Sequence, residues 1–319
     1  MLSKTFFRNP WISNTLVVGM ILLALLCMVR TPDFILLRKI ASHSTQIMIL
    51  FLGAGLFFHL FSAKRLLFTA FGCAAALCLY FKYASNINLI IPTKTSEPSF
   101  KVALTSTAEF SNELDTVFRS ILETDPHIIC FVEMTPNWAG LLDRFFKSRY
   151  PYIAHNVRVD ILGTSIYSKY PIDQVDTIYA EEVPNLKSSL QINEHYELHL
   201  IASNTNPPLF RKSFEQLRNQ LSTVAAEISR VNSQSTIAAG YYHLDQFADE
   251  LQDFRALADL NDSRKTLSPS LYPPINHLFY SDNLECLQFS NLYSQGRRIG
   301  IIGEYQYKSE SISLAKGSK

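Results

Sequence analysis

One carboxylate stands at the end of a short apolar run and is the first candidate for chemistry. The segment from Asp125 to Met134 reads DPHIICFVEM: a turn signal, five apolar residues (128–132), and then Glu133. An apolar run of this length that is rich in β-branched residues predicts a buried strand. A carboxylate at its end lies at the rim of a sheet, where sites are usually built. Glu133 is therefore a candidate site residue, although a strand end that points into water shows the same pattern.

A second pattern places His195, Glu197 and His199 on one face of an alternating segment that ends at Ala202. Two histidines and a carboxylate can bind a metal ion. Any half-buried strand also alternates with a period of two and carries polar residues on its wet face, which is the interpretation we favour. The five cysteines form no CxxC or Cys/His spacing, so neither a zinc site nor a disulfide framework is indicated.

The elements that must position these residues alternate between strands and helices. The pattern predicts strands at 100–104, 128–132, 163–172, 195–202, 236–240, 275–280 and 299–307. Helical spacing of apolar residues predicts helices at 113–123, 138–146, 210–231 and 251–260. Such alternation predicts one α/β domain, 100–308, built of two layers or more.

Three apolar stretches precede this domain, at about 11–29, 45–63 and 66–82. Each is close to the ~20 residues that a helix needs to cross a bilayer. A cleavable signal peptide could explain the first stretch but not the two behind it. The sequence therefore predicts a three-helix membrane segment (1–90), a linker (91–99), the α/β domain and a polar tail (309–319).

Charge restricts the partners more than it restricts the topology. The first 90 residues hold eight Lys or Arg and one acid, whereas the whole chain has 29 and 28, so the remainder carries a net charge of −6. A mildly acidic domain lacks the electrostatic footprint of a nucleic-acid binder. Basic residues that flank the three spans are divided four to four between the two sides, so the positive-inside rule gives no orientation. Three spans do place the domain on the side opposite the N-terminus.

The order of the segments resembles the endonuclease/exonuclease/phosphatase superfamily, in its bacterial branch with short N-terminal membrane spans. The family pattern reads DPD-apolar-QE, YPY, GxAxxSRYPI, a His-x-x-Pro-Pro loop, GDFN, a DH-apolar strand and SDHxP. Its counterparts here are DPHIICFVE, YPY, GTSIYSKYPI, NTNPP, GYYH, NHLFYS and GRRIG, which extend from about Phe100 to Tyr307. The resemblance implies a four-layered α/β sandwich of the DNase I-like type. It also implies a bacterial inner-membrane protein whose domain lies on the periplasmic side.

The resemblance implies a cleft whose chemistry has changed. In the family, the Glu at the position of Glu133 holds Mg²⁺ with help from an Asn of the first strand, and Asp, Asn and His residues of the other motifs orient water and phosphate. Glu133 is the family residue that this chain keeps. The matched cleft otherwise consists of Ser106, Asn204, Tyr241, His243, Asn276, His277, Arg297 and Arg298.

These residues favour loss of phosphoester hydrolysis. A single carboxylate binds Mg²⁺ weakly, because the ion gives up its water reluctantly. Tyr241 is bulky and neutral at pH 7, and Arg298 places a fixed cation where the family has a titrating His. We therefore expect a pseudoenzyme without a cofactor. Its two arginines could bind a phosphate or another anion without a metal, and a closed, packed surface is an equally open alternative.

Two other hypotheses assign a function to the chain: catalysis at the cleft, or binding of other subunits at its surface. The first is a remodelled phosphatase or phosphodiesterase in which Glu133, His243 and His277 hold Mg or Mn, since two histidines and one carboxylate form a known ligand set. The second is an assembly subunit whose membrane spans and outer faces bind other subunits of a membrane complex.

Overall fold

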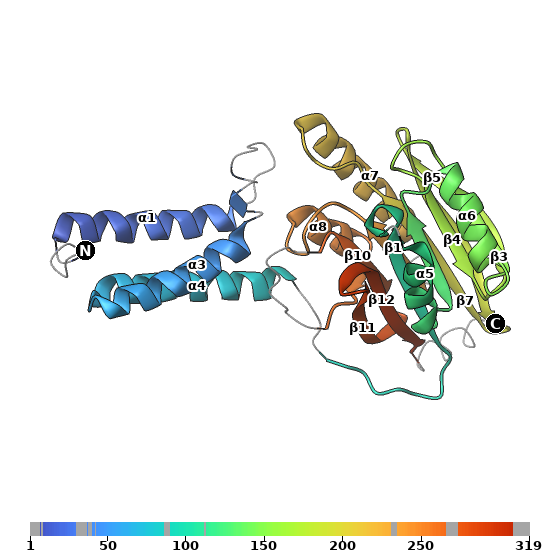
Figure 1. Cartoon of the computed structure of the whole chain (residues 1–319), viewed down its shortest axis with the longest axis horizontal. Coiled ribbons are helices and arrows are strands. Elements are labelled where there is room, and N and C mark those ends of the chain that lie inside the picture. Colours follow the sequence, from blue (N-terminus) through green and yellow to red (C-terminus); the bar gives the residue numbers. More distant parts are fainter. Residues whose placement is uncertain are drawn as a thin grey trace. The chain divides into compact units, whose positions relative to one another are not determined.

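The computed structural model describes residues 9–29, 43–85, 90–111, 113–230, 235–265 and 274–308, together with Phe7, Leu37, Ile40 and Ala41. The predicted tail 309–319 lies outside these residues. The chain forms two compact units, one made mainly of residues 1–86 and one mainly of residues 87–319. Each unit is described by itself (Figure 1).

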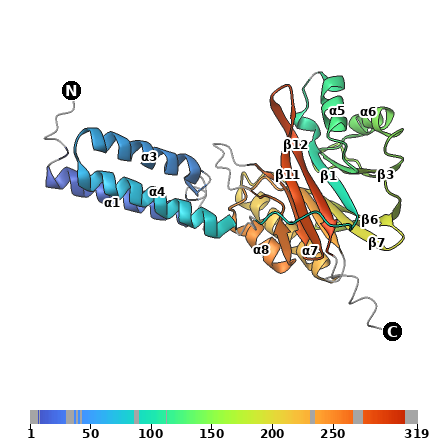
Figure 2. The same ribbon diagram turned by 90° about the horizontal axis from the view of Figure 1, so that it is seen from below.

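The N-terminal unit contains three apolar helices, α1 (Pro10–Met28), α3 (Ser44–Leu60) and α4 (Lys64–Ser85), which run alongside one another (Figure 2). A Cβ atom added to Gly55 would lie 2.8 Å from the ring of Phe71, so the absent side chain is what lets α3 approach α4 there. The Arg65 guanidinium donates a hydrogen bond to Asn14 Oδ1 at 2.7 Å, which joins α4 to α1.

Two of these helices are long and apolar enough to cross a bilayer. The segments Pro10–Met28 and Lys64–Tyr83 have mean hydropathies of 2.1 and 1.6, and Ser44–Leu60 is a shorter apolar helix. Signal sequences and core helices of soluble proteins can share this length and composition.

The second unit contains two six-stranded mixed sheets packed face to face (Figure 1). The first sheet has the order β11 (Leu284–Ser294), β12 (Arg297–Tyr307), β1 (Ser99–Ser106), β2 (Ile128–Val132), β4 (Thr164–Ser168), β3 (Tyr152–Asn156). The second has the order β5 (Ile172–Ala180), β6 (Val183–Asn193), β7 (Tyr196–Asn204), β8 (Thr236–Tyr241), β10 (Asn276–Ser281), β9 (Leu260–Asp262). The pairs β1–β2 and β7–β8 are parallel, and the other pairs are antiparallel.

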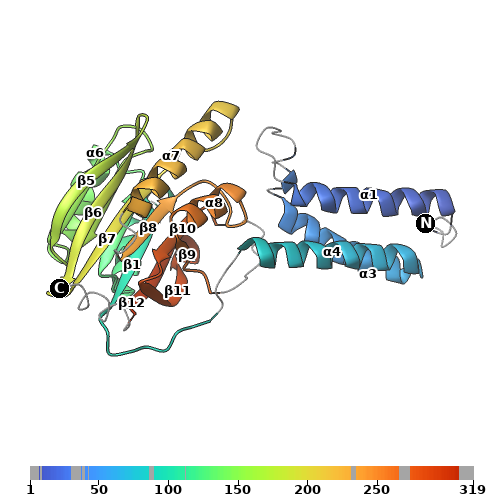
Figure 3. The ribbon, with the colours of Figure 1, turned by 180° about the vertical axis from the view of Figure 1, so that it is seen from behind.

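Helices cover the outer face of each sheet, which gives four layers. On the first sheet, α5 (Leu114–Glu123) and α6 (Pro136–Phe146) pack with Phe118 and Phe146 against Phe131 and its neighbours. On the second, α7 (Arg211–Arg230) and α8 (Asp249–Leu257) lie on the face away from the first sheet (Figure 3). The predicted α/β sandwich of the DNase I-like type is confirmed.

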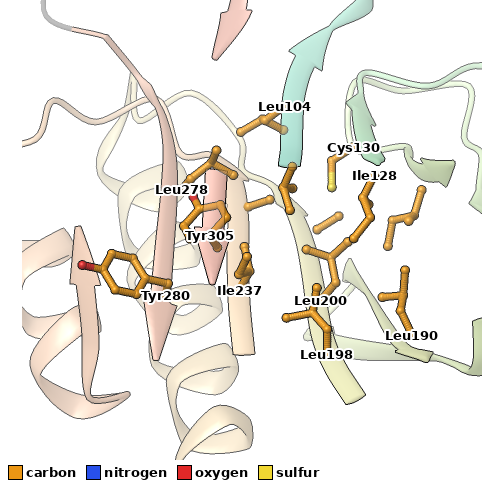
Figure 4. Packing of buried hydrophobic residues seen from close by; sticks show 14 of the residues in the cluster. Leu104, Ile128, Cys130, Leu190, Leu198, Leu200, Ile237, Leu278, Tyr280 and Tyr305 are labelled. Atoms are coloured by element: carbon orange, nitrogen blue, oxygen red, sulfur yellow. The ribbon is translucent and has the colours of Figure 1, made fainter. Parts of the chain in front are cut away.

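Strand β2 shows why its five residues are all apolar. Ile128, Cys130 and Val132 face the second sheet, whereas Ile129 and Phe131 face the helices, and all five are fully buried. A strand that is covered on both faces needs a continuous apolar run. Figure 4 shows the inner contact, in which Ile128 and Cys130 lie opposite Leu198 and Leu200.

Several predictions about the strands were wrong. The sequence analysis missed five strands, β3, β5, β6, β9 and β11, and the strand predicted to reach residue 172 ends at Ser168. The interpretation of the His195–His199 face as wet holds for His195 and Glu197, which are exposed, but not for His199, which is 8% exposed. Burial lowers the pKa of His199, so this side chain is neutral at pH 7.

Candidate functional site

The ends of strands from both sheets meet where the predicted site residues lie. Because β1 and β2 are parallel, Ser106 at the end of β1 lies beside the end of β2, which leads into Glu133. In the second sheet, Asn204, Tyr241 and Asn276 are paired in register across β7, β8 and β10. They therefore form one row across three neighbouring strands, each about 4.8 Å from the next.

Glu133 is held by the segment that follows β1. The Ser106 hydroxyl donates a hydrogen bond to Glu133 Oε2, and Thr107 Oγ1 donates to the Glu133 carbonyl oxygen at 2.8 Å. Glu133 has a φ of 60°, a left-handed conformation that non-glycine residues seldom adopt. The turn after it is closed by Gly163, whose carbonyl accepts from Met134 N at 3.0 Å. The structure thus brings Ser106 and Glu133 together, as predicted.

Tyr241 is the middle residue of this row, between Asn204 and Asn276. Its hydroxyl donates to Glu109 Oε1 at 3.1 Å, and the side chain is only 9% exposed. Burial, followed by the nearby charges of Glu109 and Glu133, raises the pKa of Tyr241. Tyr241 is therefore neutral at pH 7 and acts as a hydrogen-bond donor rather than as a base.

The two arginines reach the site from the beginning of β12. Arg297 Nη2 lies 3.5 Å from Glu109 Oε2, and its side chain is exposed. Arg298 is half-buried and donates to Asn291 Oδ1 at 3.0 Å and to Asn276 Oδ1. Burial and the charge of Arg264 lower the pKa of Arg298, although it remains protonated as guanidinium groups do in proteins.

His277 is fully buried and has both ring nitrogens engaged. Arg264 Nη1 lies 2.9 Å from Nδ1, and the Leu244 carbonyl lies 2.8 Å from Nε2. A guanidinium can only donate and a carbonyl can only accept, so the ring is neutral with its proton on Nε2. Burial, and then the charge of Arg264, lower the pKa of His277 well below its usual value.

His243 and Asn204 lie at the side of the row that adjoins β7. Thr205 Oγ1 is 3.4 Å from His243 Nδ1, and the His243 ring meets the Tyr241 ring edge-on at a centroid distance of 4.8 Å. Burial lowers the pKa of His243 to about 4. Asn204 donates to the carbonyl of Ile161, which joins the loop after β7 to the loop after β3.

The arrangement does not fit the octahedral set of oxygen ligands that Mg²⁺ requires. Within the described part of the chain, no three His, Cys, Asp or Glu side chains lie close enough together to hold one metal ion. Ser106 donates to Glu133, and Tyr241 and Arg297 approach Glu109, so both carboxylates of the site already accept from protein groups. What the cleft offers instead is a set of hydrogen-bond donors beside two guanidinium groups.

Two residues of the site were missed by the sequence analysis. Glu109 lies in the single turn of 3₁₀ helix, η2 (Thr107–Glu109), directly after β1. Its position three residues after Ser106, a candidate site residue, could have indicated that Glu109 lies near the site. Arg264 follows β9, is 5% exposed, and lies 3.3 Å from Asp262. Its spacing of two residues from Asp262 gave no signal in the sequence that this arginine is buried.

Comparison with known proteins gives the family. A family model described as "Endonuclease/Exonuclease/phosphatase family" matches residues 85–267, which is more than half of the chain. The chain therefore belongs to the endonuclease/exonuclease/phosphatase family. A search of curated protein sequences returns no match.

Solved structures agree on the fold. An endonuclease/exonuclease/phosphatase from Beutenbergia cavernae is 12% identical, with a TM-score of 0.53 over 66% of this chain and 72% of that one. A family protein from Bacteroides thetaiotaomicron is also 12% identical, with a TM-score of 0.52 over 67% of this chain and 100% of the other. A humanised TDP2 from D. rerio is 14% identical, with a TM-score of 0.52 over 65% and 99%. At these identities the likeness establishes the fold and leaves the activity to the site.

Proposed function

We propose that this chain is a membrane-anchored member of the family that no longer hydrolyses phosphoesters and that acts as a binding or assembly subunit. One observation carries the proposal: the buried Tyr241 phenol donates to Glu109, and Glu133 accepts from Ser106. The two carboxylates that could hold a metal ion thus already have protein partners: Ser106 on Glu133, and Tyr241 and Arg297 on Glu109.

The chemistry of phosphoryl transfer supports this proposal. The reaction depends on a metal ion that neutralises developing charge and on a group that positions the nucleophile. Neither role has a suitable side chain here: Tyr241 is neutral, and His277 has both ring nitrogens in hydrogen bonds. The alternative hydrolase built from Glu133, His243 and His277 needs a free nitrogen on His277, so the geometry does not favour it.

The exposed surface beside the cleft supports a binding role. On the loop after β3, Val159 is 92% exposed, and on the loop before α7, Leu209 and Phe210 are 69% and 71% exposed. The hydrogen bond from Asn204 to the Ile161 carbonyl connects the end of β7, where the second loop begins, to the first loop. Exposed apolar side chains of this size are what the interaction surface of a binding subunit would provide.

Membrane anchoring is supported by the N-terminal helices. Two of them reach the length and hydropathy of membrane spans, and the third is apolar along its 17 residues. We further propose, from the resemblance, an inner membrane with the α/β domain on the periplasmic side. Resistance of the full chain to carbonate extraction tests the anchor, and protease access to the domain in spheroplasts tests its side. Release into the soluble fraction contradicts the anchor.

Loss of the metal site is tested on the full chain in detergent by calorimetric titration with Mg²⁺ and Mn²⁺. We expect no saturable binding at millimolar metal and no cleavage of phosphomonoester or phosphodiester chromogenic substrates above background. Glu133→Ala is the site variant, and Glu123→Ala, which changes an exposed carboxylate at the end of α5, is its control. Saturable binding that Glu133→Ala abolishes and Glu123→Ala preserves would show a rebuilt metal site and refute the proposal.

A further inference from the structure

The carboxylate of Glu109 is a negatively charged group of the chain itself that is bound by Tyr241 and Arg297. Its carboxylate accepts from the Tyr241 hydroxyl at 3.1 Å and lies 3.5 Å from Arg297 Nη2. These partners come from β8 and β12, whereas Glu109 comes from the turn after β1. Groups from two strands, one in each sheet, therefore converge on a carboxylate that a third element supplies.

Arg298 lies within the electrostatic field of this cluster but has no carboxylate partner. Its two hydrogen bonds go to the neutral amide oxygens of Asn291 and Asn276, and no salt bridge to it is found among the described residues. A guanidinium carries five N–H donors, so this group keeps donors for a ligand. Tyr241 and Glu109 are both close enough to influence its charge state.

The half-buried guanidinium of Arg298 has no carboxylate partner that compensates its loss of hydration. Removing an unpaired guanidinium from water costs free energy unless an opposite charge compensates it. The buried Arg264, whose charge lowers the pKa of Arg298, is itself compensated by Asp262 at 3.3 Å. An additional anion in the cleft would supply the missing charge.

We propose that the cleft binds a phosphate-type oxyanion without a metal ion, through Arg298, Arg297 and the Tyr241 hydroxyl, and that Glu109 is the internal carboxylate that the ligand displaces. The planar guanidinium fork matches the oxygen geometry of phosphate. Tyr241 supplies a third donor, and it already binds one anionic oxygen. The inference rests on the proposed function, because a metal ion held by Glu133 would itself bind the phosphate.

The test uses the full chain in detergent with EDTA, titrated with inorganic phosphate by calorimetry. We expect saturable binding that Arg298→Gln weakens by about tenfold or more, the usual effect of losing a charged hydrogen-bond donor. Arg298→Lys keeps the charge but loses the fork, so an intermediate loss is expected. Arg119→Gln, which changes an exposed arginine on α5, controls for net charge.

Glu109→Gln separates the proposal from general damage to the fold, because it predicts a gain. Gln keeps an acceptor for Tyr241 and removes the competing charge, so phosphate should bind about threefold to tenfold more tightly. The control is Glu123→Gln, which should leave the affinity unchanged. No saturable phosphate binding, or binding that is unchanged in both Arg298→Gln and Glu109→Gln, overturns the inference and leaves the proposed function standing. Phosphate binding that needs Mg²⁺ and Glu133 overturns both.

A second arm identifies the source of the oxyanion. The same titrations are repeated in micelles doped with phosphatidic acid or with a neutral lipid. Competition by phosphatidic acid that disappears in Arg298→Gln supports a lipid headgroup as the ligand. Unchanged phosphate affinity in both kinds of micelle supports a soluble phosphate compound.

Discussion

The Tyr241 hydroxyl and Glu109 Oε1 are 3.1 Å apart, although 132 positions separate the two residues in the chain. The bond connects a strand end of the second sheet to the turn that follows β1 in the first sheet. It therefore ties the two halves of the sandwich together at the cleft.

Removing this hydroxyl should lower stability modestly. Tyr241→Phe keeps the buried ring and loses one hydrogen bond to a charged acceptor, so we expect a loss of about 1–2 kcal/mol in the free energy of unfolding. Thermal denaturation of the full chain measures it. Tyr179→Phe, which changes a tyrosine that is 61% exposed on β5, is the matched control and should be neutral. Equal effects of the two variants would contradict a structural role for the bond.

Acid should destabilise the domain through His243. Its pKa is about 4 in the folded chain and about 6.5 when unfolded, so between these values the unfolded state binds more protons. This contribution to stability is complete above pH 6.5 and is lost as the pH falls to 4. The slope for one group is at most about 1.4 kcal/mol per pH unit.

Melting temperatures recorded from pH 7 to pH 4 test this dependence. His243→Asn should flatten the curve in that window, whereas His195→Asn, at an exposed position, should follow the parent chain. His277 and His199 also have lowered pKa values, so a residual slope is expected in His243→Asn. A curve that His243→Asn leaves unchanged would refute the assignment.

A methyl group at position 163 should distort the turn behind Glu133. A Cβ on Gly163 would lie 2.0 Å from the carbonyl oxygen of Met134, a backbone atom that cannot move aside cheaply. Overpacking of this kind typically costs about 1–3 kcal/mol, so Gly163→Ala should lower the melting temperature clearly. Gly140→Ala, in α6 with no atom within 4 Å of the added methyl, should instead be neutral or stabilising. Similar shifts in both variants would contradict the close approach at Gly163.

Gln306 should control how firmly the linker is held. Its amide is fully buried, donates to the Thr93 carbonyl at 3.0 Å and to Glu285 at 2.8 Å, and accepts from Thr95 N at 3.0 Å. Gln306→Leu leaves these groups without partners, at a cost of about 1–3 kcal/mol. We expect faster tryptic cleavage after Lys94, and we expect Gln174→Leu, at an exposed position on β5, to behave like the parent chain. Unaltered cleavage in Gln306→Leu would show that the hydrogen bonds of Gln306 to Thr93 and Thr95 do not hold the linker.

The sequence predicted β2 to the residue, because a strand that is buried on both faces leaves an uninterrupted apolar run. It did not predict β11, because a register shift between Cys286 and Gln288 interrupts the alternation on which strand prediction depends. The burial of His199 was missed for a related reason: the period of two identifies a face but does not say what covers it.

Some contacts of the candidate site could also be predicted from the sequence, and others could not. Ser106 and Glu133 could be expected to meet, since both follow predicted strands and the resemblance pairs their positions. The convergence of Glu109, Tyr241 and Arg297 depends on how the two sheets stack, and no local pattern encodes that. Contacts of this range become visible only when the register of all three strands is known.

The left-handed backbone conformation of Glu133 lowers the stability of the folded chain. A non-glycine residue at a φ of 60° costs roughly 1 kcal/mol or more, and glycine or asparagine would adopt the same turn with less strain. The chain therefore keeps a carboxylate at a position where shape alone favours a different residue. Part of the folding free energy is given up to hold that charge at the strand end, so Glu133 contributes something to the cleft that the stability of the turn does not explain.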